Sequence, residues 1–146
     1  MKPEGVNRVV IAVRDLDKGI ALYSELLGAT FHEVGPLAEP FGVRAAFSWD
    51  AGIEICAPLP GRDSPMKQSI EQQGEGLVGV VFGVENVDEA RERAEKLNIR
   101  VSALIEYDQG QIRQYLQDRF KKYKQYMLKA ADTYGVRVIL GQIEAK

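Results

Sequence analysis

The sequence predicts an α+β fold made of two βαβββ modules. In the first half, a run rich in β-branched residues is followed by an amphipathic helix and three short extended segments. The beginning of this pattern occurs again 71 residues later, which indicates a repeated supersecondary unit. A chain of 146 residues, 45% of them hydrophobic, can bury one core without disulfides or metals. We therefore expect one structural domain, with modules at 1–60 and 76–146 joined by a linker at 61–75.

The first module begins with a strand and a helix. Residues 6–13 (VNRVVIAV) are predicted as a strand, and Asp15 or Asp17 can cap the helix that follows. Gly28 stands where a left-handed C-cap glycine is expected. The apolar positions of the helix recur at three- and four-residue spacing, at Ile20, Leu22, Tyr23, Leu26 and Leu27. Three extended segments follow, at 30–34, 43–49 and 52–57.

The second module repeats the first after the polar linker. GVNRVVIAVRDLDKG (5–19) aligns with GLVGVVFGVENVDEA (76–90), and most apolar positions stay apolar. A helix is predicted at 88–97, with strands near 99–105, 123–130 and 136–143.

An insertion at about 108–122 distinguishes the second module from the first. The segment is polar, with Ile112, Tyr115, Leu116 and Phe120 spaced as one face of a short helix. One interpretation is a surface helix that packs against the module. The other is a lid that closes over a cavity.

Charge and rare residues exclude several classes of protein. With 19 Lys and Arg against 21 Asp and Glu, the chain gives no electrostatic reason to expect nucleic acid or an anionic membrane as a partner. One cysteine, Cys56, and one histidine, His32, exclude an intramolecular disulfide and any zinc site that needs two such residues. A Ser-His-Asp triad would have to use His32. Without a signal peptide or an apolar stretch of about 20 residues, we expect a cytoplasmic protein.

Several segments together resemble the vicinal oxygen chelate superfamily, which includes glyoxalase I, bleomycin resistance proteins, methylmalonyl-CoA epimerase and extradiol dioxygenases. They are VNRVVIAVRDLDKGIALYSELLG, GIEICAP, GLVGVVFGVENVDEA and ADTYGVRVIL. The resemblance covers nearly the whole chain except 108–122. It implies that the sheets of the two modules curl into a cup, commonly completed within a homodimer.

Catalytic members of this superfamily hold a metal with four side chains, usually His at the first strand of each module and Glu or a similar residue in the last. Carried onto this sequence, these positions are Arg8, Glu54, Gly79 and Ile139. Only Glu54 offers a metal ligand, because a guanidinium has no lone pair to donate and the other two have no donor. We therefore expect no metal and no other cofactor.

Strand alternation predicts which side chains face the implied cup. Val9, Ile11 and Val13 form an apolar row for the helix side, which leaves Arg8, Val10 and Ala12 facing inward. The same alternation places three further sets inward: Glu54 and Cys56; Gly79, Val81 and Gly83; Arg137, Ile139 and Gly141. An unpaired carboxylate there is costly, so we hypothesise that Arg8 or Arg137 pairs with Glu54. The alternative is that both arginines are solvated at strand ends.

The remaining candidates each have a structural and a functional interpretation. His32 is either a half-exposed strand residue or a general base, and Cys56 is most simply a small buried hydrophobe. Tyr115 and Phe120 pack in the core or cover a flat ligand. Trp49 is either a rim residue of a pocket or an anchor at the sheet edge.

The leading prediction is a metal-independent protein that binds a flat or anionic small organic molecule, as bleomycin resistance proteins do. The predicted ligand-binding residues are Arg8, Val10, Trp49, Glu54, Val81, Tyr115, Arg137 and Ile139. The first alternative is a metal-free isomerase, cyclase or lyase that uses Glu54 as its base. The others are a metal enzyme of the glyoxalase or dioxygenase type with unconventional ligands, and a purely structural or partner-binding protein.

Overall fold

The computed structural model describes all residues, 1–146, and divides them into two compact units. The first unit contains residues 8–78, and the second contains residues 1–7 and 79–146. Each unit contains a mixed sheet with helices, so the predicted α+β class is confirmed. None of the helices has the length and hydropathy of a membrane-spanning segment.

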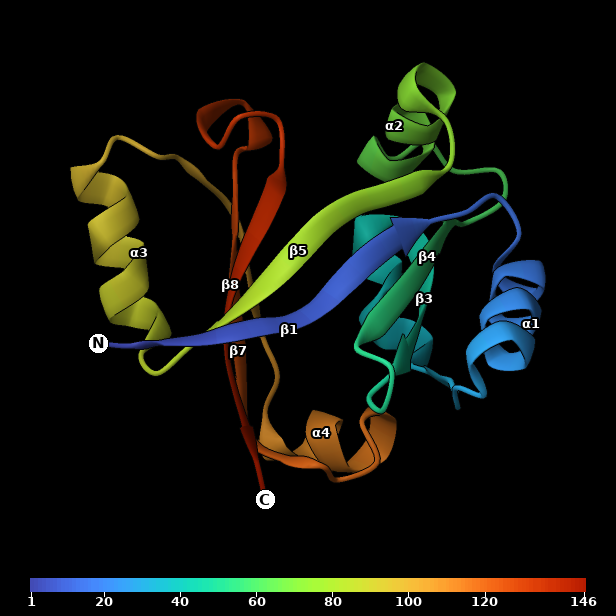
Figure 1. The fold of residues 1–146 in the computed structure, drawn as a ribbon, viewed down its shortest axis with the longest axis horizontal. Coiled ribbons are helices and arrows are strands. Elements are labelled where there is room, and N and C mark those ends of the chain that lie inside the picture. The colour runs from blue at the N-terminus through green and yellow to red at the C-terminus, as the bar shows by residue number, and fades with distance from the viewer. The chain divides into compact units, whose positions relative to one another are not determined.

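The first unit carries the first βαβββ module (Figure 1). Its strands follow the order β2, β3, β4, β1, in which β4 runs parallel to β1 and antiparallel to β3. The elements of this part of the chain are β1 (Pro3–Ala12), α1 (Leu16–Leu27), β2 (His32–Glu33), η1 (Gly35–Leu37), η2 (Glu39–Phe41), β3 (Val43–Ser48), β4 (Ile53–Pro58) and α2 (Pro65–Gln73).

Helix α1 forms where the capping residues predict it. The Asp15 carboxylate accepts a hydrogen bond from the Lys18 backbone N–H at 3.1 Å, and Gly28 ends the helix in the left-handed conformation, with φ at 67°. The helix contributes its first residue, Leu16, to a cluster of buried apolar side chains whose other members come from β3 and β4. Val9, Ile11 and Val13 pack against this cluster, which consists of Leu16, Ala46, Ile53, Ile55 and Ala57. The predicted helix-side row of the first strand is therefore confirmed.

The second unit carries the second module, with the strand order β5, β8, β7, β6. Strand β8 is parallel to β5 and antiparallel to β7, as β4 is to β1 and β3. Its elements are β5 (Gly76–Val84), α3 (Val87–Lys96), β6 (Val101–Glu106), α4 (Gln109–Tyr115), β7 (Phe120–Leu128), η3 (Ala130–Asp132) and β8 (Arg137–Ala145). Val84, Val87, Ala90 and Tyr126 form its buried cluster, and Leu140 packs against it.

The repeat extends to individual polar contacts. The residues that cap α1 and α3, Asp15 and Asn86, are 71 positions apart in sequence. Two residues after each cap, an aspartate in the first turn of the helix pairs with a cation: Asp17 with Arg44 at 3.4 Å and Asp88 with Lys124 at 3.0 Å. The Tyr126 hydroxyl also donates to Asp88 at 2.7 Å, and these two contacts lower the pKa of the Asp88 carboxyl.

An arginine clamps the turn that precedes β8 in the second unit. Arg100 donates from Nε and Nη2 to the two carboxylate oxygens of Asp132, at 2.9 and 3.0 Å, and from its backbone N–H at 2.9 Å. These hydrogen bonds lower the pKa of Asp132 from 3.8 to about 2. The clamp ties the start of β6 to η3.

Three parts of the sequence interpretation need correction. The polar segment predicted as a linker, 61–75, contains helix α2, which begins with Ser64 as its cap and Pro65 as its first residue. Phe120, predicted on the face of the inserted helix, is the first residue of β7. The segment predicted as a strand at 30–34 forms only the two-residue strand β2.

Helix α4 is anchored by buried side chains. Ile112 and Leu116 are 0% and 1% exposed, and α4 packs against β7. Asp108 and Gln111 form a reciprocal capping box at its start, and the Gln109 amide donates to the Lys121 carbonyl at 2.7 Å. These contacts agree with the first interpretation of the insertion, a surface helix that packs against the module.

Candidate functional site

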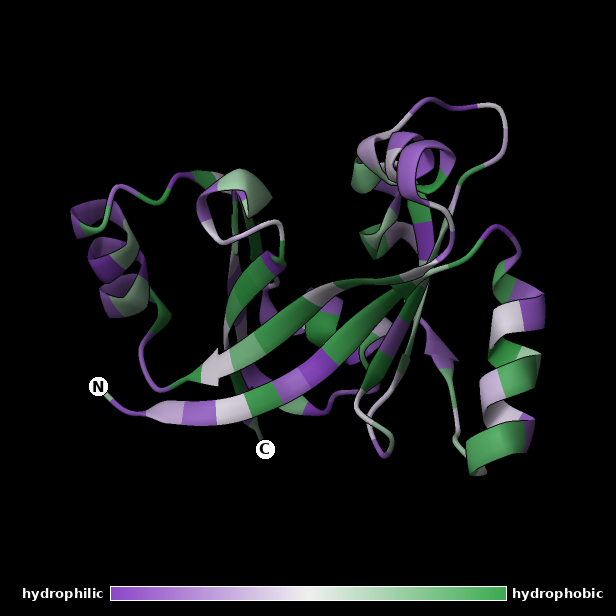
Figure 2. Cartoon of the chain, turned by 45° about the horizontal axis from the view of Figure 1, so that its top comes forward, coloured by the Kyte–Doolittle hydropathy of each residue, from purple (hydrophilic) through white to green (hydrophobic).

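A buried ion pair joins β1 to β4 in the first unit. Arg8 Nε donates to Glu54 Oε1 at 2.8 Å, and the side chains are 2% and 14% exposed. Val10 lies directly opposite Glu54 in the parallel register, so Arg8, Val10 and Glu54 share the face of the sheet away from α1. The hypothesis that Arg8 pairs with Glu54 is therefore confirmed. Figure 2 shows the corresponding hydrophilic stretch in the middle of β1, between hydrophobic ones.

Two aromatic rings extend this pair along β3. The Arg8 guanidinium carbon lies 4.6 Å from the centre of the Phe47 ring, a cation–π contact. Phe47 stacks on Trp49, with ring centres 4.8 Å apart and planes at 8°. Trp49 follows directly after β3, which ends at Ser48. The cation, the carboxylate and two aromatic rings thus lie on one face of the first unit.

The second oxygen of Glu54 is also occupied. Cys56 lies two residues further along β4 on the same face, and its thiol donates to Glu54 Oε2 at 3.0 Å. Cys56 is 3% exposed, as expected for a small buried side chain. Because both carboxylate oxygens have donors within the first unit, Glu54 is held in one orientation.

The single histidine lies on the same face at the edge of the sheet. His32 on β2 is directly opposite Phe47 on β3, and Phe47 is opposite Glu54 on β4. Side chains directly opposite one another in an antiparallel pair point to the same face. His32 is half-buried there, two strands away from Glu54.

Sequence reasoning missed Phe47 and underestimated Cys56. Phe47 precedes Trp49 by two residues in a predicted strand, so strand alternation was a signal that could have put it on the face of Trp49. Its contact with Arg8 depends on the order of β1, β4 and β3, which the sequence does not contain. Glu54 and Cys56 were already predicted on one face, and that spacing was the signal for their hydrogen bond.

The predicted ligand-binding residues divide between the two units. The first unit contains Arg8, Val10, Trp49 and Glu54, and the second contains Val81, Tyr115, Arg137 and Ile139. Val10, Val81 and Ile139 are buried, with exposures of 5%, 0% and 6%. Trp49, Tyr115 and Arg137 are half-buried. In the second unit, Val81 lies opposite Ile139 as Val10 lies opposite Glu54 in the first, so Ile139 is the counterpart of Glu54.

The four positions that correspond to the superfamily's metal ligands do not fit a divalent cation. Arg8 has no lone pair to donate and already occupies one oxygen of Glu54. A Cβ atom at Gly79 would lie 3.0 Å from the Arg137 carbonyl oxygen, so a ligand side chain there requires a backbone shift. Ile139 offers only hydrocarbon. No group of three or more His, Cys, Asp or Glu side chains is arranged to hold a metal ion.

Comparison with known families agrees with this fold. Residues 5–139 match the model of the Glyoxalase/Bleomycin resistance protein/Dioxygenase superfamily, and the chain belongs to that superfamily. The expectation drawn from the sequence is therefore confirmed at the level of the family.

The curated relatives include mammalian epimerases. Mitochondrial methylmalonyl-CoA epimerase of Homo sapiens is 36% identical over 98 residues, which cover 65% of this chain and 54% of that protein. The Mus musculus enzyme is 35% identical over 98 residues, with the same coverage. The chain therefore spans about half the length of the curated relatives it matches.

Solved structures with similar folds cover almost the entire chain. Methylmalonyl-CoA epimerase from Mycobacterium tuberculosis has a TM-score of 0.75 at 23% identity, covering 99% of this chain and 89% of that one. Hypothetical protein BH1468 from Bacillus halodurans C-125 has a TM-score of 0.74 at 18% identity, covering 97% and 95%. A methylmalonyl-CoA epimerase in complex with methylmalonyl-CoA and NH4+ has a TM-score of 0.72 at 22% identity, covering 99% and 100%. At these identities the likeness establishes the fold.

Proposed function

We propose that this protein binds a small anionic organic molecule and does so without a divalent metal. The observation that carries the proposal is the Arg8–Glu54 pair, a fixed cation at a position where catalytic relatives hold a metal ligand. The neighbouring Phe47 and Trp49 rings add flat apolar surface, which suits a planar or partly apolar ligand. The predicted binding residues of the second unit, among them Tyr115, Arg137 and Ile139, stay predictions.

Acyl-CoA thioesters are the first ligands to test. The curated relatives are named for methylmalonyl-CoA, and one structure of the same fold contains that compound. Methylmalonyl-CoA combines a carboxylate, a thioester and phosphates, so it offers the negative charge that arginine side chains bind well.

A metal-free isomerase, cyclase or lyase is the second candidate, because the relatives are epimerases and Glu54 lies at a superfamily site position. In such an enzyme Glu54 would remove a proton beside a carbonyl, and Arg8 would stabilise the developing negative charge. The Oε2 oxygen is the one available for this step, because the thiol that occupies it is a weak donor. The two engaged oxygens favour the binding protein, since a base must first release one of them.

Calorimetric titration of methylmalonyl-CoA into chelator-treated protein tests the proposal. We expect binding that is unchanged by added divalent cations and at least about tenfold weaker in Arg8→Gln. Arg14→Gln is the matched control, because Arg14 forms an exposed pair with Glu75 in the same unit. Binding that appears only after a divalent cation is added would contradict the proposal.

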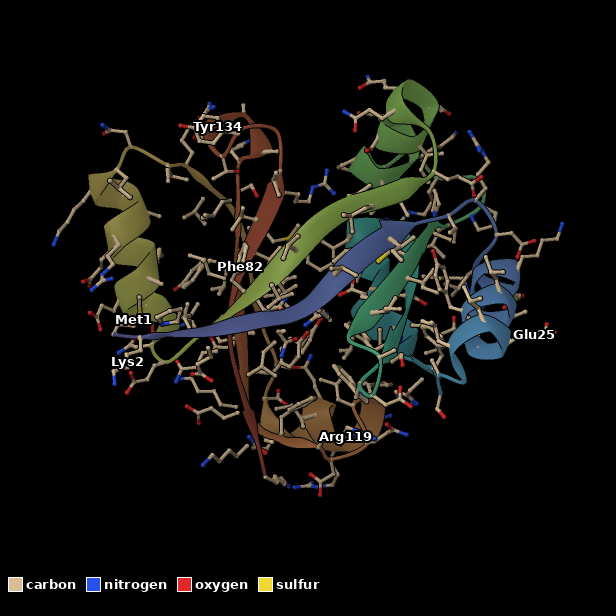
Figure 3. The ribbon with its side chains drawn as sticks, viewed as in Figure 1. Met1, Lys2, Glu25, Phe82, Arg119 and Tyr134 are labelled. Carbon is tan, nitrogen blue, oxygen red and sulfur yellow. The ribbon has the colours of Figure 1, made fainter.

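We also propose that the protein forms a homodimer and that it is located in the cytoplasm. Two large apolar side chains of the second unit, Val6 and Phe82, are 58% and 38% exposed, and Figure 3 marks Phe82 on β5. A second copy of the chain would cover such groups. Light scattering coupled to size-exclusion chromatography measures the mass directly, and a monomer at micromolar concentration would contradict the dimer.

A further inference from the structure

Arg137 is a half-buried arginine of the second unit. We propose that it binds an oxyanion, a carboxylate or a phosphate, and this inference rests on the proposed function of binding a small organic anion. Arg137 begins β8 and lies opposite Gly79 on β5. Leu140 packs on the α3 side of the same strand, so Arg137, Ile139 and Gly141 occupy the other face.

None of the hydrogen bonds and ion pairs of the structure involves the guanidinium of Arg137. Other arginines of the chain contrast with it, because Arg100 binds both oxygens of Asp132 and Arg44 binds both oxygens of Glu33. Arg137 is also half-buried, so an anion bound there is partly shielded from water. Its five N–H donors match the paired oxygens of a carboxylate or phosphate.

Gly79 makes room for this side chain. A Cβ atom at Gly79 would lie 3.5 Å from Cβ and 3.7 Å from Cγ of Arg137, as well as 3.0 Å from its carbonyl oxygen. The aliphatic part of Arg137 therefore lies beside Gly79, at ordinary van der Waals distance from the place of such a Cβ atom. The tight contact would be with the carbonyl oxygen, so a larger residue at position 79 would require the backbone at the start of β8 to shift.

Arginine and glycine occupy opposite strands at equivalent positions of the two modules. Arg8 in the first module corresponds to Gly79 in the second, because Val10 and Val81 are equivalent. The counterpart of Arg137 is Gly52, whose carbonyl accepts from the Val9 N–H at 3.0 Å. The arginine thus lies on the first strand in the first module and on the last strand in the second, and a glycine stands at the other position. In the first module Glu54 pairs with the arginine, whereas its counterpart Ile139 offers no carboxylate to Arg137.

Three thioesters distinguish the oxyanion that Arg137 binds: methylmalonyl-CoA, propionyl-CoA without the carboxylate, and methylmalonyl-pantetheine without the nucleotide phosphates. Calorimetry with each compound compares wild type, Arg137→Gln, Arg137→Lys and Arg113→Gln. Arg113→Gln is the matched control, because Arg113 is an exposed arginine of α4 in the same unit. We expect Arg137→Gln to weaken methylmalonyl-CoA binding at least about tenfold and Arg137→Lys to restore part of it, while the control changes it less than about twofold.

The pattern among the compounds assigns the group. If Arg137 binds the carboxylate, Arg137→Gln removes the preference for methylmalonyl-CoA over propionyl-CoA. If it binds a phosphate, the variant removes the preference for methylmalonyl-CoA over methylmalonyl-pantetheine. Equal affinity of a folded Arg137→Gln and wild type for all three compounds would overturn the inference while leaving the proposed function intact.

Failure of the proposed function gives a different result, because the wild type then binds none of the three thioesters. Titration of malonate or inorganic phosphate, followed through the Arg137 Nε–H signal by nuclear magnetic resonance, tests the anion site without them. A saturable shift of that signal that is absent for Arg113 supports the inference. Equal, non-saturating shifts of both arginines overturn it.

Discussion

Arg8 Nε lies 2.8 Å from Glu54 Oε1, in a pair whose arginine is only 2% exposed. This contact connects two parallel strands on the sheet face away from α1, at two of the positions that the resemblance to the superfamily assigns to metal ligands. A guanidinium and a carboxylate satisfy one another there, so this face carries a fixed charge pair.

Removal of Arg8 tests the burial of this pair. Arg8→Gln leaves the Glu54 carboxylate without its cation, and we expect a loss of about 3 kcal/mol in the free energy of unfolding. The exposed pair of Arg14 and Glu75 is the control, and Arg14→Gln is expected to cost less than about 1 kcal/mol. Urea denaturation followed by circular dichroism measures both. The double variant Arg8→Leu with Glu54→Leu should be more stable than Arg8→Gln. Equal losses in the free energy of unfolding for Arg8→Gln and Arg14→Gln would show that burial of the pair has no energetic effect.

Glu54→Gln separates a binding protein from an isomerase. The amide keeps an acceptor for Arg8 but cannot act as a base, so affinity for methylmalonyl-CoA should stay within about threefold of wild type. Proton magnetic resonance in deuterated water measures exchange at the carbon between the carboxylate and the thioester. As a binding protein, the wild type should not exchange this proton faster than buffer. Exchange by wild type that Glu54→Gln abolishes would establish the isomerase instead.

Ile112 tests the packing of α4. Its side chain is completely buried, so Ile112→Ala should destabilise the protein by about 2 to 4 kcal/mol. Its neighbour Arg113 is exposed, and Arg113→Ala should change stability by less than about 0.5 kcal/mol. Thermal and chemical denaturation measure both variants. Similar values for the two would mean that α4 is a loosely held lid.

Asp132 gives a pH-dependent contribution with a defined window. Its folded-state pKa of about 2 is below its ordinary value of 3.8, so the clamp with Arg100 contributes stability above pH 3.8. That contribution is lost as the pH falls through about 2, where the folded-state carboxylate takes up its proton. Asp132→Asn should therefore be less stable than wild type at pH 7 and equal to it below pH 2. Carbon-13 titration of the carboxyl group checks the midpoint, and a midpoint near 4 would contradict the clamp.

Much of the first module could be predicted because its signals are local. Asp15, Gly28 and the alternation of Val9 and Ile11 fix a cap, a helix end and a strand face within a few residues. The Arg8–Glu54 pair also followed, since a carboxylate on an apolar face needs a cation and only a few were on that face.

Other features depended on contacts that sequence patterns do not carry. Helix α2 has local signals in Ser64 and Pro65, but its polar composition concealed the two buried residues, Met66 and Ile70. No glycine marks the end of α4. The positive φ angles that a glycine would usually supply are adopted by Gln117 and Asp118, at 57° and 55°. The position of His32 depends on the pairing of a two-residue strand, which is too short to show alternation.

Metal content is the measurement that tests the central proposal most directly. Protein purified without chelators, incubated with cobalt, zinc, manganese or magnesium and then dialysed, is analysed by inductively coupled plasma mass spectrometry. Because Arg8, Gly79 and Ile139 supply no ligand, we expect less than about 0.1 ion per chain for every metal. One tightly held ion per chain that is lost in Glu54→Ala would contradict the proposal and establish a metal site at this position.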